Sequence, residues 1–267
     1  MAAALARLPC DTVELVAIEG RGLGLRALVD LARGSLVVSE PPIYTARVDD
    51  FSAPAFLARH DIARLMRIVE AGCDGDGYTA EARAALDAVV DIHAAEGIAA
   101  LGAAAGRRVW SLDDCFRRPA VGDAVCVEGL ASDRGRPLNG LRGVVEGRDG
   151  ADRWAISTAR GRKSVRDRNL KTAGGIFRTN AYFSAGSGHI FETLCRANHA
   201  CDANATKAMR DKGRTKVVDV TTTRDVRRGD ELTVSYVGAG AGDTADRRAY
   251  LAAKYNFHCE CAACEGP

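Results

Sequence analysis

The stretch Cys195-Arg-Ala-Asn-His-Ala-Cys-Asp-Ala-Asn-Ala205 decides how this chain of 267 residues is organised. It contains an Asn-His pair, Asn198 and His199, with Cys201 two residues further on. The stretch is too polar for a core strand, and its Asp-Ala-Asn end favours a turn. A cysteine in such a loop calls for a partner elsewhere in the chain, and the C-terminal residues supply candidates.

Three of these candidates, Cys259, Cys261 and Cys264, lie within six residues near the C-terminus. Three thiols at this spacing suit a tetrahedral metal site that needs a fourth ligand. A redox motif or an incidental cluster is the alternative. Redox motifs, however, usually lie at a helix start within a βαβ unit, and no such pattern is present.

The fourth ligand has four candidates in the sequence, namely Cys195, His199, Cys201 and His258. His258 adjoins Cys259, and neighbouring residues rarely reach one metal ion without strain. We favour Cys201, because it completes a site of four cysteines and explains the cysteine of the polar loop. Four protein ligands leave no open position, so the site is expected to be structural zinc that orders the short tail.

The composition is that of an ordinary globular protein, with 47% hydrophobic and 27% charged residues. The formal net charge of +2 is not typical of a dedicated DNA-binding protein. No apolar run approaches the ~20 residues of a membrane helix, and Met1–Pro9 lacks the apolar stretch of a secretory signal. Nine scattered cysteines argue against a disulfide framework. We therefore expect a non-membrane protein, and a monomer.

The N-terminal part alternates in residues 12–18, which predicts a strand. The following Arg21-Gly-Leu-Gly24 lets the backbone approach a ligand closely. It lacks the spacing of a dinucleotide-binding turn. Residues 53–70 have helical periodicity, and Thr79 is a cap for a second helix that fades into a linker over 94–106.

From Pro119 the sequence changes to short β runs with an Asn139-Gly140 turn. Four or five strands in about 50 residues predict a small barrel, similar to SH3-like or KOW-like barrels. Residues 153–171 are rich in Arg and Lys. The segment is either a module that binds nucleic acid or a peptide, or a solvated spacer, and we favour the spacer.

The C-terminal half is expected to be β again. Strands are predicted over 176–184, 189–192, 206–210, 215–223 and 231–236. Asp243 or Thr244 is then expected to cap a helix that carries Tyr250, Leu251 and Tyr255.

Four sequence elements together resemble the SET-domain protein methyltransferases. They are Arg21–Leu25 with Ala32–Val37, Asn198–Asn204, Gly229–Tyr236 and the cysteine tail, which is similar to the family's post-SET zinc tail. Arg247-Arg-Ala-Tyr-Leu251 and the helices between the two halves look most like the SMYD branch, here without its MYND finger. The 119–172 segment is not part of the resemblance.

The resemblance implies a mostly β fold with helices, of the β-clip SET type with a pseudoknot. It divides the chain into N-terminal SET strands (10–50), a helical insert (51–110), the inserted barrel (119–172), the C-terminal SET core (173–240) and a post-SET helix with its zinc tail (243–265). The pseudoknot would place the polar loop beside the strand that ends at Tyr236.

The resemblance also implies the roles of single residues. S-adenosylmethionine would be bound by Arg21, Gly22, Leu23, Gly24, Asn180, Asn198, His199, Tyr236 and Phe257. Tyr236 would be the catalytic residue beside the transferred methyl group, and Phe257 an apolar platform for the adenine. Zinc would be held by Cys201, Cys259, Cys261 and Cys264.

The implied activity is methylation of lysine side chains on a protein substrate, histone or not, in the nucleus or cytoplasm. The transfer is an in-line displacement, so positioning dominates. The target lysine must arrive as a neutral amine, and an apolar channel beside a sulfonium lowers its pKa. The alternative is a SET scaffold with weak catalysis that acts as a protein-binding or nucleic-acid-binding module through its barrel.

Overall fold

The computed structural model describes residue 8 and the ranges 10–47, 60–74, 77–184, 187–213, 215–238 and 241–266. The first part of the helix predicted over 53–70 lies outside the described residues. The chain forms two compact units, one of Met1–Ile43 with Ile190–Pro267 and one of Tyr44–His189. The boundaries of the five segments expected from the sequence remain predictions.

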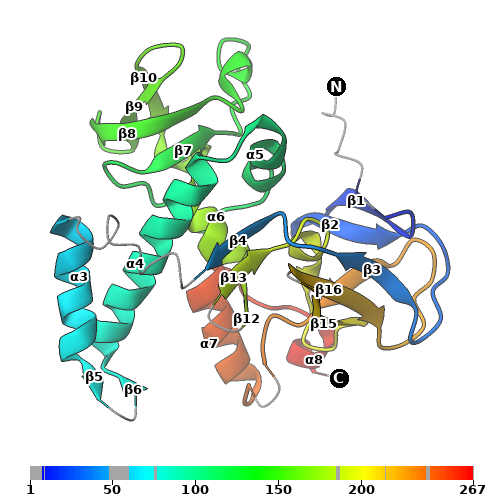
Figure 1. Cartoon of the computed structure of the whole chain (residues 1–267). Helices are drawn as coiled ribbons and strands as arrows, with labels where there is room; N and C mark the ends of the chain where they lie inside the picture. Colours follow the sequence, from blue (N-terminus) through cyan, green and yellow to red (C-terminus); the bar gives the residue numbers. More distant parts are fainter. Residues whose placement is uncertain are drawn as a thin grey trace. The chain divides into compact units, whose positions relative to one another are not determined.

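A seven-stranded sheet forms the first unit (Figure 1). Its strands in spatial order are β1 (Val13–Ile18), β2 (Gly22–Ala27), β17 (Glu231–Val234), β15 (Ala205–Lys212), β16 (Thr215–Thr222) and β3 (Leu36–Glu40), with the two-residue β14 (Asn198–His199) beside β17. Strands from both ends of the chain therefore share one sheet, with β17 next to β2.

Alternating burial explains the outer hairpin of this sheet. Val13 and Leu15 of β1 are buried, and so are their partners Ala27 and Leu25 on β2. Gly22, with φ +73°, has the left-handed conformation that the turn before β2 requires. The strand predicted over residues 12–18 is thus confirmed.

The polar loop that opens with Cys195 lies beside β17, as expected. A 3-10 turn, η3 (Leu194–Arg196), leads into β14, which pairs with β17 in parallel register, Asn198 opposite Thr233. The Asn204 side chain then pairs with the backbone of β17 as a neighbouring strand would. It donates to the Glu231 carbonyl and accepts from the Thr233 N–H, both at 2.8 Å. This amide fixes the register of the loop against β17.

The helix after β17 begins as the sequence predicted. The α7 helix (Thr244–Tyr255, orange-red in Figure 1) has Asp243 as its N-cap, and Asp246 completes a capping box. Asn256 ends the helix in a left-handed conformation, φ 58° and ψ 37°. The chain turns there towards the cysteines and α8 (Ala262–Glu265).

The second unit contains four described helices, α3 (His60–Ala71), α4 (Ala80–Ala99), α5 (Ala103–Trp110) and α6 (Ala173–Asn180). The Thr79 hydroxyl caps α4 by accepting from the Ala82 N–H at 3.2 Å. The prediction of a linker over residues 94–106 is wrong. Ala94 and Ile98 are fully buried, so α4 runs on to Ala99 before α5 begins.

The strand predicted over 176–184 is also wrong for its first half, which is helix α6. The Thr172 hydroxyl caps this helix by accepting from the Gly175 N–H at 2.9 Å. In the structure Ile176, Phe177 and Asn180 are buried, at the i, i+1, i+4 spacing of a helix. In the sequence, the apolar run Ile176-Phe177 is only two residues long and is compatible with a helix or a strand. Short apolar runs do not separate the two by periodicity alone.

A five-stranded antiparallel sheet occupies the segment in which a barrel was predicted. Its order is β10 (Lys163–Arg166), β9 (Arg153–Thr158), β8 (Arg142–Arg148), β7 (Ala124–Val127) and β11 (Leu170–Thr172). Val125, Val145 and Ile156 lie in its core at 0–1% exposure. The Asn139 side chain closes a long loop on Leu130 rather than a two-residue hairpin. Closure into a barrel remains a prediction.

The remaining strands of the second unit are short. They form a three-stranded sheet in the order β12 (Tyr182–Ser184), β13 (Ser187–Ile190), β4 (Tyr44–Arg47), and a pair of β5 (Cys73–Asp74) and β6 (Gly77–Tyr78). The chain between the strands predicted over 176–184 and 189–192 lies partly outside the described residues. The fold class is therefore mostly β with helices, as expected. Among the described helices, none has the length and apolar character needed to cross a membrane.

Candidate cofactor site and metal centre

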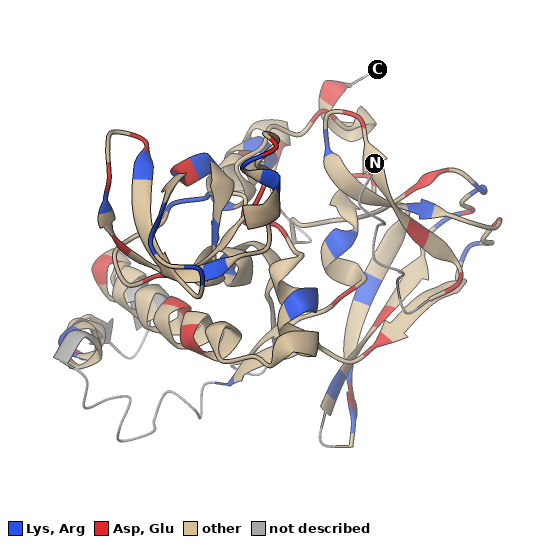
Figure 2. Ribbon diagram, turned by 90° about the horizontal axis from the view of Figure 1, so that it is seen from above, with Lys and Arg blue, Asp and Glu red and all other residues tan. Residues whose placement is uncertain are grey.

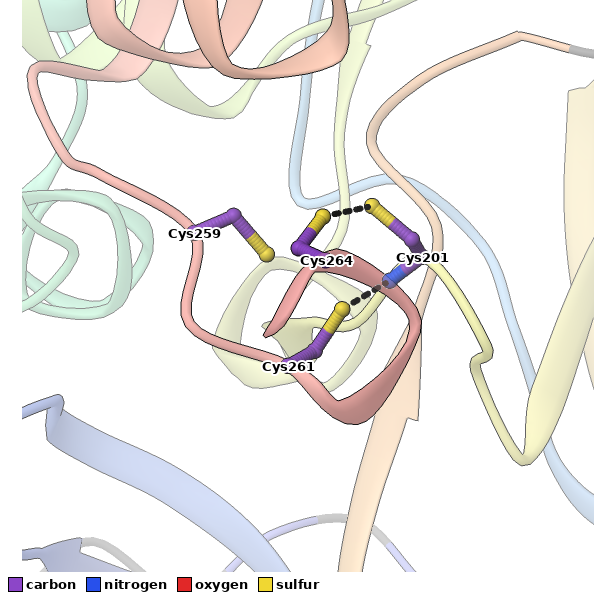
Figure 3. Close-up of side chains that lie close together, drawn as sticks. All are labelled: Cys201, Cys259, Cys261 and Cys264. Atoms are coloured by element: carbon purple, nitrogen blue, oxygen red, sulfur yellow. Dashed lines mark hydrogen bonds between the residues drawn. The ribbon is translucent and has the colours of Figure 1, made fainter. Parts of the chain in front are cut away.

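The sulfur atoms of Cys201, Cys259, Cys261 and Cys264 converge, all within 4.8 Å of one another (Figure 3). Cys201 comes from the polar loop, and the other three come from the tail. Cys201 Sγ is 3.4 Å from Cys264 Sγ, and the Cys201 N–H donates to Cys261 Sγ at 3.4 Å. The cluster contains the four predicted ligands, and neither Cys195 nor His258 belongs to it.

This cluster fits zinc by its chemistry and its size. Four thiolates in tetrahedral array about zinc lie about 3.8 Å apart, given Zn–S bonds of about 2.3 Å. The sulfur atoms of the cluster, all within 4.8 Å of one another, are close to that spacing. Cys259 and Cys264 are buried with Leu251 of α7, and Phe257 and Tyr255 pack on the same group. A metal here would hold the tail against the polar loop.

His199 lies between this cluster and the strand end. Its Nδ1 accepts the backbone N–H of Tyr236 at 2.9 Å, and its Nε2 is 3.3 Å from Cys201 Sγ. Because Nδ1 accepts, the proton of the neutral ring is on Nε2 and faces the sulfur. Burial, with Arg21 and Lys207 nearby, lowers the pKa of His199 to about 4. The imidazole is therefore neutral at physiological pH.

Glu231 joins two of the predicted cofactor residues. Its Oε2 is 2.7 Å from Nη1 of Arg21, and its Oε1 accepts from Nδ2 of Asn198 at 2.8 Å. Arg21 also donates to the backbone carbonyl of His199. One carboxylate thus ties the turn before β2 to the Asn-His pair, and the ion pair that does so joins residues 210 positions apart in the sequence.

Gly24 leaves no room for a side chain at this point. A Cβ atom at Gly24 would lie 2.6 Å from Nδ2 of Asn198, 2.7 Å from Cγ1 of Ile18 and 3.0 Å from Oε1 of Glu231. Gly22 and Leu23 precede it at the surface. The absence of a side chain at Gly24 is what allows Asn198 to approach the backbone of β2.

An aromatic group surrounds the end of β17. The Tyr236 ring centroid is 5.3 Å from that of His199, 4.7 Å from that of Tyr255 and 6.5 Å from that of Phe257. The Tyr236 hydroxyl donates to the Ala197 carbonyl at 2.7 Å. Burial raises the pKa of Tyr236, so the phenol keeps its proton. Its oxygen retains the capacity to accept.

The first unit therefore brings together most of the residues predicted for the site. They are Arg21, Gly22, Leu23, Gly24, Asn198, His199, Tyr236 and Phe257, beside the four cysteines. Asn180 belongs to the second unit, where its amide donates to the carbonyls of Asp113 and Ile176 at 2.8 Å. Its role towards a cofactor remains a prediction.

Three further residues belong to this site although no motif in the sequence had indicated it: Glu231, Tyr255 and Arg247. Tyr255 packs on Tyr236, and Arg247 donates to Cys201 Sγ. Glu231 opens β17, and the alternation of the strand predicted over 231–236 indicated a shared face of Leu232, Val234 and Tyr236, which leaves Glu231 out. The sequence did contain a signal for this contact, namely a charged residue at the start of the strand and an arginine in the glycine turn.

Comparisons with known proteins agree on one family. The SET domain model matches residues 22–237. The histone-lysine N-methyltransferase SET5 of Yarrowia lipolytica (strain CLIB 122 / E 150) is 32% identical over 78 residues, which is 29% of this chain and 17% of that protein. The chain thus matches about a sixth of the length of this curated relative.

A solved structure, the SET domain of LSMT bound to lysine and AdoHcy, is similar over 95% of this chain and 54% of that chain. The sequence identity is 10% and the TM-score is 0.40, too low to show a shared fold. The family model alone spans most of the 267 residues, from β2 to just past Tyr236. This chain belongs to the SET domain family.

Proposed function

We propose that this protein transfers a methyl group from S-adenosylmethionine to lysine side chains of a protein substrate. The observation that carries the proposal is the convergence of the Asn198–His199 pair, Tyr236 and Phe257 beside a four-cysteine cluster. Membership of the SET domain family and the similarity to a histone-lysine N-methyltransferase support it.

The cofactor would lie between the glycine turn and the polar loop. Arg21, Gly22, Leu23 and Gly24 would surround its amino-acid end with backbone. Gly24 would support this role through Asn198, because the absence of a side chain at Gly24 lets Asn198 lie against the backbone of β2. Asn198 and the neutral His199 would orient the polar groups from the other side.

Phe257 would supply the apolar platform for the adenine. Its ring centroid is 6.0 Å from that of His199, and its place follows from the turn at Asn256 and the cluster at Cys259. Zinc, bound by the four thiolates, would supply a structural link and no reaction chemistry, because no coordination position is left open.

Tyr236 is the proposed catalytic residue. When bound, the cofactor supplies an electrophilic methyl group on a sulfonium. The protonated phenol, fixed by its bond to the Ala197 carbonyl, presents a polar oxygen with remaining acceptor capacity. This oxygen would orient the target amine, and the neighbouring rings would keep the amine dehydrated and neutral.

The test is transfer of a labelled methyl group from S-adenosylmethionine to a mixed protein extract. Labelled lysine in a protein product supports the proposal. Tight binding of S-adenosylhomocysteine without any transfer, in every extract tried, would instead identify a scaffold that has lost turnover. Fractionating the products into histones and other proteins defines the substrate class, and cell imaging tests the proposed nuclear or cytoplasmic location.

A second candidate function rests on charge. Residues 119–172 contain 11 Lys and Arg against 7 Asp and Glu, which leaves 26 basic and 28 acidic residues elsewhere in the chain. The segment therefore has a net charge of +4 and the remainder −2. Figure 2 shows the basic positions spread over the strands and turns of this sheet, with acidic positions between them.

Two loops of this sheet join through Arg160, whose Nη1 donates to the Pro137 carbonyl at 3.0 Å. This places Arg160 and Arg162 near the loop of Arg134 and Arg136. Such a group would bind phosphate backbones in a salt-dependent way. Charge reversal of Arg160 and Arg162 should then abolish binding of a duplex oligonucleotide, whereas reversal of Arg228 in the first unit should not. Equal binding by both variants would rule this candidate out.

A further inference from the structure

One arginine of α7, Arg247, contacts the cysteine cluster. Arg247 Nε donates to Cys201 Sγ at 3.3 Å, and its Nη2 is 3.7 Å from Cys264 Sγ. Cys201 belongs to the polar loop and Cys264 to the tail. A single guanidinium therefore contacts a sulfur from each of the two segments that the cluster joins.

The other donors of this guanidinium fix its plane. Nη1 donates to the Gly242 carbonyl at 3.1 Å, while Nη2 donates to Thr244 Oγ1 at 3.0 Å and to the Ala263 carbonyl at 3.3 Å. Each of the three nitrogens thus has an acceptor, so the planar fork has one orientation. The contacts come from the start of α7 and from α8 as well as from the sulfurs.

The negative charge of a four-thiolate zinc centre indicates what the Arg247 guanidinium would do there. A zinc ion with four thiolates has a formal charge of −2, and two of the four cysteines here are buried. Ligand sulfurs in such a centre are stabilised by N–H donors of the outer shell. The Cys201 N–H supplies one neutral donor, to Cys261. Arg247 supplies a positive charge together with directed N–H groups.

The neighbouring arginine provides a natural comparison. Arg248 lies one residue further along α7, and its Nε donates at 3.0 Å to the backbone carbonyl of Cys259, not to a sulfur. Both arginines are half-buried and contact the tail. They differ in one respect: the guanidinium of Arg247 contacts sulfur atoms that would bind the metal, whereas the guanidinium of Arg248 does not.

We propose that Arg247 is a positioning residue for the zinc centre: it stabilises the thiolates of Cys201 and Cys264 and fastens the tail to the polar loop. The inference rests on the zinc site of the proposed function. It assigns to α7 a part in holding Phe257 in place, because the tail that carries Phe257 is anchored through the same cluster.

The experiment compares the full-length wild type with Arg247→Gln, Arg247→Lys and Arg248→Gln, after metal analysis of each. The first readout is the rate of zinc transfer to a chromogenic chelator. Outer-shell changes alter metal affinity by about 10–100-fold, so we expect release from Arg247→Gln to be faster by about that factor. Arg248→Gln should release zinc at the wild-type rate, and Arg247→Lys should fall between.

The second readout is the charge-transfer band of the cobalt-substituted proteins. Loss of N–H donors makes the thiolates better electron donors, so the band should move to lower energy in Arg247→Gln only. A change in overall fold alone would not produce this shift while four sulfurs still bind cobalt. Arg247→Lys, which keeps the charge, provides the comparison if Arg247→Gln folds poorly.

The outcomes separate this inference from the proposed function. Wild-type protein that binds no zinc would overturn both the metal site and the role of Arg247. Zinc-loaded wild type with equal release rates and equal bands in the Arg247→Gln and Arg248→Gln variants would overturn the role of Arg247 alone. Selective change in Arg247→Gln, with partial rescue by lysine, supports it.

Discussion

Replacing Gly24 by alanine tests the geometry of the cofactor site most directly. The added Cβ would lie 2.6 Å from Nδ2 of Asn198 and 2.7 Å from Cγ1 of Ile18. Ordinary contacts are about 3.5–4.0 Å, so each neighbour must move by about 1 Å. Overpacking of this kind costs about 1–3 kcal/mol. Displacing Asn198 also weakens its bond to Glu231, which contributes about 1 kcal/mol.

The matched control is Gly147→Ala, in strand β8. A Cβ atom at Gly147 meets nothing within 4 Å, and its φ is not in the left-handed region. Alanine in a strand is favoured over glycine by about 0.5–1 kcal/mol. The two substitutions should therefore change stability in opposite directions, by about 2–4 °C in melting temperature per kcal/mol.

The assay combines thermal unfolding with calorimetric titration of S-adenosylhomocysteine. Gly24→Ala should melt lower than the wild type and bind this ligand about 10-fold or more weakly, since about 1.4 kcal/mol corresponds to tenfold. Gly147→Ala should bind as the wild type does. If Gly24→Ala binds the ligand with wild-type affinity, the proposed cradle at the glycine turn is wrong.

Three further predictions concern the aromatic group, the metal and a buried carboxyl. Tyr236→Phe should keep cofactor binding and lose about 100-fold or more in turnover, as loss of an oriented polar group at a reacting centre commonly does; full activity in the methyl-transfer assay would contradict the catalytic role. Chelation of zinc should abolish cofactor binding and turnover together, because Phe257 loses its anchor; activity that survives complete removal, measured by metal analysis, would refute the link. Burial raises the pKa of Glu40 above its usual value of 4.5 although the N–H groups of Thr193 and Leu194 donate to it. The folded state thus binds this proton more tightly, and stability should fall as pH rises through the folded pKa. Glu40→Gln should remove that slope in denaturant titrations between about pH 4 and 8, and an unchanged slope would exclude Glu40 as its source.

Most of the candidate site could be predicted because its parts are short and each has its own chemistry. The tail cysteines required a fourth ligand, and Cys201 was favoured because it completes a site of four cysteines and explains the cysteine of the polar loop. The structure brings these four sulfurs together. The glycine turn, β17 and Tyr236 also lie in one unit.

Other features of the site could not be predicted, because they depend on contacts between residues that are distant in the sequence. Glu231 acquires its role only when β17 pairs with β2, which brings Arg21 within 2.7 Å. Arg247 looks like any exposed helical arginine until the tail folds back beside it. The helix at 173–180 was missed because its Thr172 cap lies in a strand and its apolar run is too short to show a period.

The pairing of Arg21 with Glu231 also constrains how the protein is made. During synthesis the glycine turn emerges early, but its partners follow 178 residues later at His199 and 210 residues later at Glu231. Contacts of such separation form slowly, since much chain must be ordered before they are gained. The proposed cofactor cradle is therefore expected to be open in every nascent chain. A ligand that binds only the closed cradle would act as a late folding aid for this protein.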